Sequence, residues 1–189
     1  DGLDVLQAKG FPYSIRDLLG DASAAERYRD GKFVTLRLKS SMYHRFHAPC
    51  AGRVSAINYI SGDTWNVNPI ALKRVEGLFC KNERAVLDLQ LPEPGQHVAI
   101  VAAAAILAAS IKLHCLGPPL DMRYRGPNRI PCDAAFERGD ELGYFQHGST
   151  LIVFGSEGFD LCEDVAEGAM VRVGQPLMRR PQVHSQREP

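Results

Sequence analysis

The sequence has no excess of charge of either sign, because its 22 Lys and Arg residues balance 22 Asp and Glu residues. Proteins that bind nucleic acids gain much of their affinity from clustered basic residues that meet phosphates. The balance therefore gives no reason to expect a nucleic-acid partner. The length of 189 residues suits one domain, residues 1–189, that can bury a core of its own.

Cysteine is scarce, and the five cysteines are scattered along the chain without a Cys-x-x-Cys pair. Their odd number argues against a disulfide framework, and the missing pair argues against a zinc ribbon. The pattern favours a reducing compartment and predicts no metal site. The cysteines are Cys50, Cys80, Cys115, Cys132 and Cys162.

Long hydrophobic runs are also absent. The most apolar stretch, Val98–Ile111, is rich in Ala. It is shorter than the roughly 20 residues that a membrane-spanning helix needs. No signal peptide opens the chain. Residues 1–6 read as part of a strand, so we expect further sequence to precede residue 1.

The sequence does contain a series of short strand-like segments separated by turns. Residues 32–38 alternate between polar and apolar side chains, as a half-buried strand does. Similar segments cover 50–60, 85–91, 97–104 and both sides of 148–150. We therefore expect a mainly β fold of the α+β class with few short helices.

One helix is clearly signalled, over residues 15–19. Ser14 stands at the N-cap position, Asp17 at the capping-box position, and Gly20 ends the helix. Residues 22–28 are a candidate for a second short helix.

Two Gly-centred segments, 48–60 and 164–177, resemble the hairpins of lipoyl- and biotinyl-type domains. They lead us to expect a barrel-like β-sandwich. Between them, residues 116–133 are rich in Gly, Pro and Arg, which predicts a long irregular loop.

Charged and aromatic residues along the chain have a structural and a functional interpretation. Arg123, Arg125 and Arg129 could meet phosphate or lipid headgroups, or they could be solvated. Charges at Glu83 and Arg84, at a strand entrance, could orient a site, although charges in such places are usually solvated. The lone Trp65 indicates a core or interface anchor.

The step Gly148-Ser149-Thr150 stands between two strand-like segments. A turn explains it simply, since Gly supplies conformational freedom and Ser and Thr supply local hydrogen bonds. The alternative is chemical: a hydroxyl at Ser149 can attack the open carbonyl carbon of Gly148. On the tripeptide alone, the turn is the better explanation.

His44 and His47 lie three residues apart in Tyr43-His-Arg-Phe-His47. Surface or core histidines are the default interpretation. A metal pair lacks a third ligand cluster close by. A pair of acid/base groups is the third interpretation, because histidine titrates near neutral pH.

Taken together, several stretches resemble the phosphatidylserine decarboxylase family in order and spacing across nearly the whole chain. The Tyr-His-x-x-His-x-Pro and Gly-Ser-Thr elements are specific in combination. The stretches are 6–10 with Tyr13-Ser14, 43–49, Gly62-Asp63 with 67–69, Phe79 with Asn82-Glu83-Arg84, 141–145, and Gly148-Ser149-Thr150.

The resemblance implies a self-processing enzyme with a pyruvoyl group. In that chemistry Ser149 attacks Gly148 and the chain is cut between them, giving a β-chain 1–148 and an α-chain 149–189. Ser149 becomes the covalent pyruvoyl group, whose ketone takes up the substrate amine and the electrons released with CO2. The reaction converts phosphatidylserine to phosphatidylethanolamine.

The resemblance also implies residue roles. His47 corresponds to the base that activates Ser149, oriented by an acidic partner. His44 corresponds to the residue that assists decarboxylation and reprotonates the substrate, and His44, Tyr43 and Thr150 to substrate contacts. The chain departs from the family in two ways: the acidic partner is expected upstream of residue 1, and His147 stands where many members have Leu.

Two other functions fit the sequence. One is a pyruvoyl decarboxylase that acts on another amino-lipid, which sequence alone does not separate from the first. The other is a non-enzymatic carrier of the lipoyl or biotinyl type. That function needs an exposed Lys at a hairpin tip, typically beside Met, and Met170 and Met178 have no such neighbour.

The resemblance implies a phospholipid substrate held in a membrane and peripheral contact with that membrane. The expected location is the cytoplasmic face of the cell membrane, with the mitochondrial inner membrane as the alternative. The expected partners are the chain's own α- and β-chains, and a homodimer is compatible with the sequence.

Overall fold

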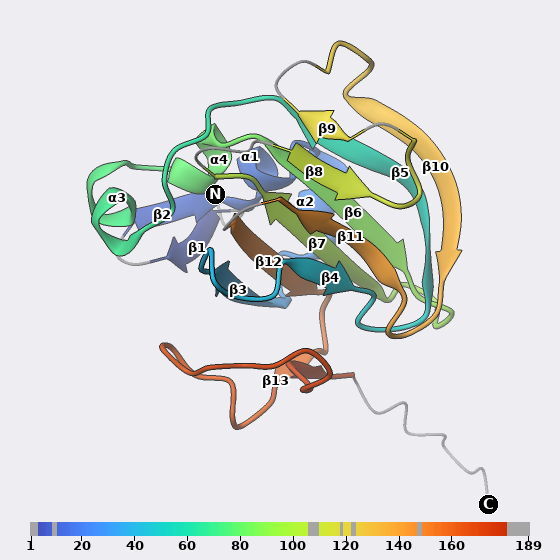
Figure 1. Ribbon diagram of the computed structural model, residues 1–189. Coiled ribbons are helices and arrows are strands. Elements are labelled where there is room, and N and C mark those ends of the chain that lie inside the picture. The colour runs from blue at the N-terminus through green and yellow to red at the C-terminus, as the bar shows by residue number, and fades with distance from the viewer. Residues whose placement is uncertain are drawn as a thin grey trace, which may run out of the picture.

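The computed structural model describes residues 4–8, 11–105, 110–117, 119–121, 124–146 and 149–180. Two antiparallel sheets lie face to face, and short helices cover the outer face of the larger sheet (Figure 1). The described residues are thus mainly β with four short helices, as the sequence predicts. A closed barrel is not confirmed, because the strands form separate sheets of six, four, two and two strands.

The larger sheet has six antiparallel strands, and β12 lies inside it between β7 and β3. Its burial is complete along its length, since every residue of β12 is buried. In spatial order the strands are β10 (Arg129–Phe136), β5 (Gly52–Ile60), β6 (Arg84–Gln90), β7 (His97–Ala103), β12 (Ser149–Gly155) and β3 (Lys32–Leu38).

The smaller sheet covers one face of the six-stranded sheet (Figure 1). Its strands are β4 (Arg45–His47), β11 (Glu141–Phe145), β8 (Ser110–Leu113) and β9 (Leu120–Asp121). Side chains from both sheets form the inner core, in which Phe46 and Phe145 pack with ring centroids 5.3 Å apart. We call this region the inter-sheet core.

Helices α1 (Ile15–Leu19), α2 (Ala22–Arg27) and α4 (Leu78–Lys81) pack on the opposite face of the six-stranded sheet. Their apolar residues form a second core with Val86, Val101 and Ile152, which alternate with inter-sheet core residues along their strands. We call it the helix-side core. Helix α3 (Pro69–Arg74) lies beyond α4 at one end of the molecule (Figure 1).

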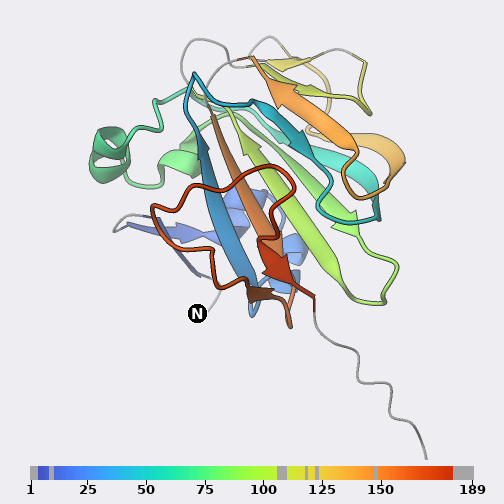
Figure 2. The ribbon, with the colours of Figure 1, turned by 60° about the horizontal axis from the view of Figure 1, so that its bottom comes forward.

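Two smaller ladders complete the fold. Strands β1 (Asp4–Ala8) and β2 (Phe11–Ser14) form a hairpin ahead of α1, and β13 (Asp160–Leu161) pairs with β14 (Met178–Arg179). The segment between β13 and β14 lies outside the two main sheets in both views (Figures 1 and 2). Its residues form turns and no strand, so the hairpin expected over 164–177 is absent.

Local signals explain α1. The Ser14 hydroxyl accepts a hydrogen bond from Asp17 N at 3.2 Å, which satisfies a free amide of the first turn. Gly20 has φ of 67°, a left-handed conformation that favours glycine at a helix end. The N-cap at Ser14 and the stop at Gly20 that the sequence predicts are confirmed.

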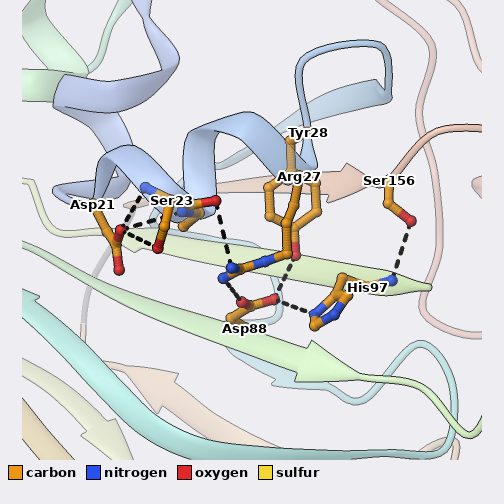
Figure 3. Close-up of polar contacts among 8 residues, drawn as sticks. Asp21, Ser23, Arg27, Tyr28, Asp88, His97 and Ser156 are labelled. Atoms are coloured by element: carbon orange, nitrogen blue, oxygen red, sulfur yellow. Dashed lines mark hydrogen bonds and ion pairs between the residues drawn. The ribbon is translucent and has the colours of Figure 1, made fainter. Parts of the chain in front are cut away.

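Asp88 on β6 joins α2 to the helix-side face of the sheet (Figure 3). Its carboxylate accepts hydrogen bonds from Arg27 Nη2 and from Tyr28 Oη at 2.5 Å, and it lies 3.2 Å from His97 Nδ1. Burial raises the pKa of Tyr28, and the charge and hydrogen bond of Asp88 add to the effect. The cluster is a polar latch between α2, β6 and β7.

Two sequence predictions of local structure are wrong. The expected loop over 116–133 contains β9, and from Arg129 onward it contains β10, an edge strand that accommodates Pro131 because its outer side needs no donor. Helices α3 and α4 were not predicted, although Asn68 caps α3 by accepting from Ala71 N at 2.8 Å. That cap and the Pro after it are the signal that could have found α3.

Candidate active site

Ser149 is the first residue of β12, and its side chain is almost fully buried, with 1% exposed. It pairs with Leu38 on β3, and Thr150 pairs with Ala103 on β7. One residue further along these antiparallel strands, Ser149 lies opposite Ala104. Gly148 and His147, the other residues of the predicted cleavage region, lie outside the described residues.

Side-chain alternation sends Ser149 and Thr150 to opposite faces of the sheet. Leu151 and Val153, which share the face of Ser149, belong to the inter-sheet core, whereas Ile152 belongs to the helix-side core. Ser149 therefore faces the space between the two sheets. Thr150 faces the helices, and its buried Oγ1 has no hydrogen-bond partner among the described residues.

The two predicted histidines also lie on opposite faces of their sheet. His44 directly precedes β4. Side-chain alternation places it on the same face as Phe46 and Ala48, which both belong to the inter-sheet core. Its Nε2 atom is buried and has no hydrogen-bond partner in the part of the chain that the structure describes. His44 is thus the histidine that alternation places on the side of Ser149.

His47 lies on the outer face of β4 and has partners at both ring nitrogens. Its Nδ1 lies 2.9 Å from the carbonyl oxygen of Gly139, and its Nε2 lies 2.8 Å from the hydroxyl of Tyr43, whose ring stacks on it. A carbonyl can only accept, so Nδ1 carries the proton and Nε2 accepts from Tyr43. The structure brings Tyr43 and His47 together and places both away from the face of Ser149.

Glu83, which the sequence offered either as a charge that orients a site or as a solvated one, is a buried carboxyl group next to this site. Its side chain is 0% exposed, and neither carboxyl oxygen has a hydrogen-bond partner among the described residues. The neighbouring Tyr59 hydroxyl donates to the backbone oxygen of Asp121 at 2.9 Å. The pKa of Glu83 is raised to about 7, chiefly by burial, with an opposing influence from Tyr59 and a further raising influence from Asp121.

The residues on either side of Glu83 are buried and fully engaged. Asn82 Nδ2 donates to the carbonyls of Trp65 and Ala104, both at 2.8 Å. Arg84, 3% exposed, donates to four backbone carbonyls, those of Asp17, Leu18, Cys80 and Asn82. The expectation that the charges at 83 and 84 are solvated is therefore wrong.

A carbonyl group formed from Ser149 would fit these surroundings. The position is nearly closed to water, and its neighbour in the sheet, Ala104, has a small side chain. Among the described residues, the buried polar atoms that lack partners include Glu83 Oε1 and Oε2 and His44 Nε2, which alternation places on the side of Ser149, and Thr150 Oγ1, which lies on the helix side. Buried polar atoms without partners are uncommon in folded proteins. They indicate a place where polar chemistry is completed by a group other than the resting side chains.

Among the described residues, no three His, Cys, Asp or Glu side chains gather as a metal ion requires. Within the same residues, none of the helices is long and apolar enough to cross a bilayer.

Comparison with known proteins gives one consistent result. The family model for phosphatidylserine decarboxylase matches residues 1–179. The phosphatidylserine decarboxylase proenzyme of Shewanella sediminis (strain HAW-EB3) is 37% identical over 187 residues, which cover 94% of this chain and 64% of that protein.

Two further relatives carry the same name. The phosphatidylserine decarboxylase proenzyme of Vibrio cholerae (strain ATCC 39541) is 37% identical over 180 residues, covering 91% of this chain and 62% of its own length. That of Methylibium petroleiphilum is 36% identical over 183 residues, covering 94% and 64%. The chain thus spans a little under two thirds of the length of the curated relatives that it matches.

Proposed function

Because this chain belongs to the phosphatidylserine decarboxylase family, we propose that it is the catalytic part of a self-processing enzyme that converts phosphatidylserine to phosphatidylethanolamine and CO2. The observation that carries the proposal is the position of Ser149, buried at the start of β12 on the side where His44 Nε2 and the Glu83 carboxyl oxygens have no partner among the described residues. The proenzyme names of the relatives support processing of the chain.

The prosthetic group of the proposed enzyme is a pyruvoyl group derived from Ser149. When formed, it supplies a ketone that accepts the electrons released with CO2. The chain's own residues exclude water from position 149, hold the backbone of β12 between β7 and β3, and present proton-carrying side chains from the neighbouring strands.

We assign different roles to the two histidines. His47 has a fixed tautomer, with its basic nitrogen at Nε2, as a base that activates a hydroxyl needs. To reach Ser149, its ring must leave Gly139 and Tyr43 and turn inward. His44 already lies on the inner face with a bare Nε2, which suits proton transfer to the substrate after CO2 leaves.

Intact mass spectrometry of the purified chain tests the proposed processing. The expected result is two chains divided between Gly148 and Ser149, with residue 149 as a ketone. Ser149→Ala should remain one chain and release no CO2 from phosphatidylserine. Ser156→Ala is the matched control, because Ser156 is a buried serine just beyond the other end of β12, and it should be cut normally. An active preparation with one uncut chain and an intact Ser149 would refute the proposal.

We also propose that the chain works on a membrane surface, since its substrate is a two-chain lipid. The arginine-rich segment supports this in part: Arg125 and Arg129 are exposed, and Arg123 lies outside the described residues. Each basic residue near an anionic surface contributes roughly 1 kcal/mol to membrane binding.

A second surface near the site also suits a bilayer. Trp65 is 46% exposed and Ile70 is 63% exposed, and the basic residues Lys73 and Arg74 follow on α3. Trp65 is tied through Asn82 to Ala104, the residue opposite Ser149. Tryptophan is enriched at membrane interfaces, where its ring suits the headgroup level.

Vesicle flotation separates the two surfaces. One variant changes Arg123, Arg125 and Arg129 to Ser, and the other changes Trp65 and Ile70 to Ser. Salt-sensitive binding to anionic vesicles that only the first variant weakens would assign the contact to the arginines. Salt-resistant binding that only the second weakens would assign it to the α3 region, and normal binding by both variants would refute both assignments.

A further inference from the structure

We propose that Glu83 is a further catalytic residue, whose protonated carboxyl group donates a hydrogen bond to the reacting group at residue 149 across the methyl group of Ala104. The inference rests on the proposed function, since it concerns the same site. The carboxyl proton stays on Glu83, so the residue acts as a hydrogen-bond donor and transfers no proton.

The geometry of the six-stranded sheet places Glu83, Ala104 and Ser149 in one row. Ala104 N donates to Glu83 O at 2.8 Å, which continues the pairing of Arg84 with Ala103. Ala103 also pairs with Thr150, so Ala104 and Ser149 are the next pair. With one strand between them, the Cα atoms of Glu83 and Ser149 lie on the order of 10 Å apart.

The side chains of this row point to the same face. Ala85 and Leu87 lie two and four residues after Glu83, so alternation puts them on the same face as Glu83. Both belong to the inter-sheet core, as do Ala104 and Leu151. Glu83 and Ser149 therefore extend into the same space, and only the small side chain of Ala104 lies between them. A group that forms at residue 149 therefore lies on the same side of the sheet as the Glu83 carboxyl.

The backbone of Glu83 is held in place, whereas its carboxyl oxygens have no hydrogen-bond partner among the described residues. Asn82 and Arg84 anchor the backbone on both sides through hydrogen bonds to carbonyls. The Glu83 amide donates to Asp63 O at 2.8 Å. The side chain is thus aimed by a rigid backbone while its own oxygens stay available.

The environment keeps this carboxyl neutral up to about pH 7, because burial raises its pKa. The titratable groups that face it are Tyr59 from β5 and Asp121 from β9. The Tyr59 hydroxyl donates to the backbone oxygen of Asp121 at 2.9 Å, and its presence lowers the pKa of Glu83, although burial outweighs it. A neutral Glu83 keeps its own proton for a partner in the site.

A purely structural role makes the opposite prediction. A buried carboxyl without partners destabilises the folded state, and an apolar side chain of similar size relieves that cost. If Glu83 only fills space, Glu83→Met should be at least as stable as the wild type and equally active. If Glu83 is the donor, the same variant should be stable but should lose the reaction.

The experiment compares the wild type, Glu83→Met and Glu83→Gln for CO2 release and for self-cleavage. Loss of one donor to a developing negative charge typically costs about 100- to 1000-fold in rate, so Glu83→Met should lose that much CO2 release. Glu83→Gln retains an N–H donor of the same shape and should stay within about tenfold of the wild type. Glu83→Met at the wild-type rate would overturn the proposal.

The pH profile gives a second readout. The wild-type rate should fall as pH rises through about 7, because the ionised carboxylate cannot donate. That fall should be missing in Glu83→Gln, which does not titrate. If Glu83→Gln keeps the same fall, another group causes it and the proposal is wrong.

Infrared spectroscopy separates this inference from the proposed function. In the uncut Ser149→Ala chain, a protonated-carboxyl band at pH 6 should disappear on Glu83→Gln, whatever the activity of the wild type. Absence of the band would overturn the Glu83 inference alone. A wild type that shows the band but neither cuts itself nor releases CO2 would instead overturn the proposed function.

Discussion

Asp88 lies on β6 and Glu83 directly precedes that strand, five residues earlier, yet their carboxyl groups have opposite surroundings. Asp88 faces the helices and receives hydrogen bonds from Arg27 and Tyr28 beside His97 (Figure 3). Glu83 faces the inter-sheet core and receives none from the described residues. The fold thus provides several partners for the Asp88 carboxylate and none, among the described residues, for the Glu83 carboxyl oxygens.

The difference indicates which acid is retained for chemistry. A buried carboxylate with several donors stabilises a fold, whereas a buried carboxyl without partners costs free energy. Such a cost persists in a natural protein when the residue has another task. The two histidines show the same contrast, since His47 is engaged at both nitrogens and His44 has a bare Nε2.

Replacement of each histidine by Ala tests the difference between His47 and His44, and it should have the largest effect of the changes proposed. His47→Ala should block cleavage completely, because the base for Ser149 is lost. His44→Ala should still be cut at least in part, but CO2 release should fall about 100-fold or more for want of a proton donor. Gel analysis of cleavage beside CO2 release measures both. Equal, complete loss of cleavage in the two variants would contradict the different roles assigned to His47 and His44.

Removal of Asp88 should damage stability and leave the chemistry intact. Asp88→Ala deprives the buried Tyr28 hydroxyl and the partly exposed Arg27 of their acceptor, which we expect to cost about 2 kcal/mol in the free energy of unfolding, mostly through Tyr28. Urea unfolding of the uncut Ser149→Ala chain, with and without the change, measures it. Asp88→Asn, which keeps an oxygen acceptor, should lose less. Unchanged stability in Asp88→Ala would show that the latch contributes nothing.

The pH dependence of stability sharpens the contrast further. The pKa of Glu83 is 4.5 in a reference peptide and about 7 in the folded chain. The folded state therefore binds the extra proton between these values, so stability contributed by neutral Glu83 is complete below pH 4.5 and is lost as pH rises to about 7. Between pH 5 and pH 8 the loss should be about 2 kcal/mol. Glu83→Gln in the Ser149→Ala chain should lack this component, and an identical pH dependence in both chains would contradict it.

The smallest expected effect concerns Tyr59. Tyr59→Phe removes the hydroxyl that lowers the pKa of Glu83 and that donates to Asp121 O. The alkaline fall in CO2 release should move to higher pH, and stability should decrease by about 1 kcal/mol for the lost hydrogen bond. Rate profiles and urea unfolding measure the two effects. A shift of the alkaline fall to lower pH would contradict the assigned influence of Tyr59.

Local chemistry explains what could be predicted from sequence. The cap at Ser14 and the stop at Gly20 define α1, and the alternation over 32–38 defines β3, because each signal acts within one element. The strand β10 escaped prediction because Pro131 and its neighbours suggest a loop, and only the place of β10 at the sheet edge makes the proline acceptable.

The candidate site was only partly predictable for a similar reason. Ser149 and the two histidines are marked by motif. The burial of Arg84, in contrast, depends on carbonyls of Asp17 and Leu18, which are remote in sequence. Likewise, Glu83 becomes a candidate only when β7 and β12 place Ser149 on the same face. Nothing local distinguishes it from a solvated acid at a strand entrance.

The central position of β12 has a consequence for the proposed mature enzyme. A cut before residue 149 would leave β12 paired on both sides, with β7 and β3, so the two pieces would stay joined by main-chain hydrogen bonds and buried side chains. Once heat separated them, however, reassembly would require two molecules to meet, and its yield would depend on concentration. The missing serine would also prevent a second round of processing. The mature protein would then be protected by the slowness of its unfolding, and its durability would be described by a half-life.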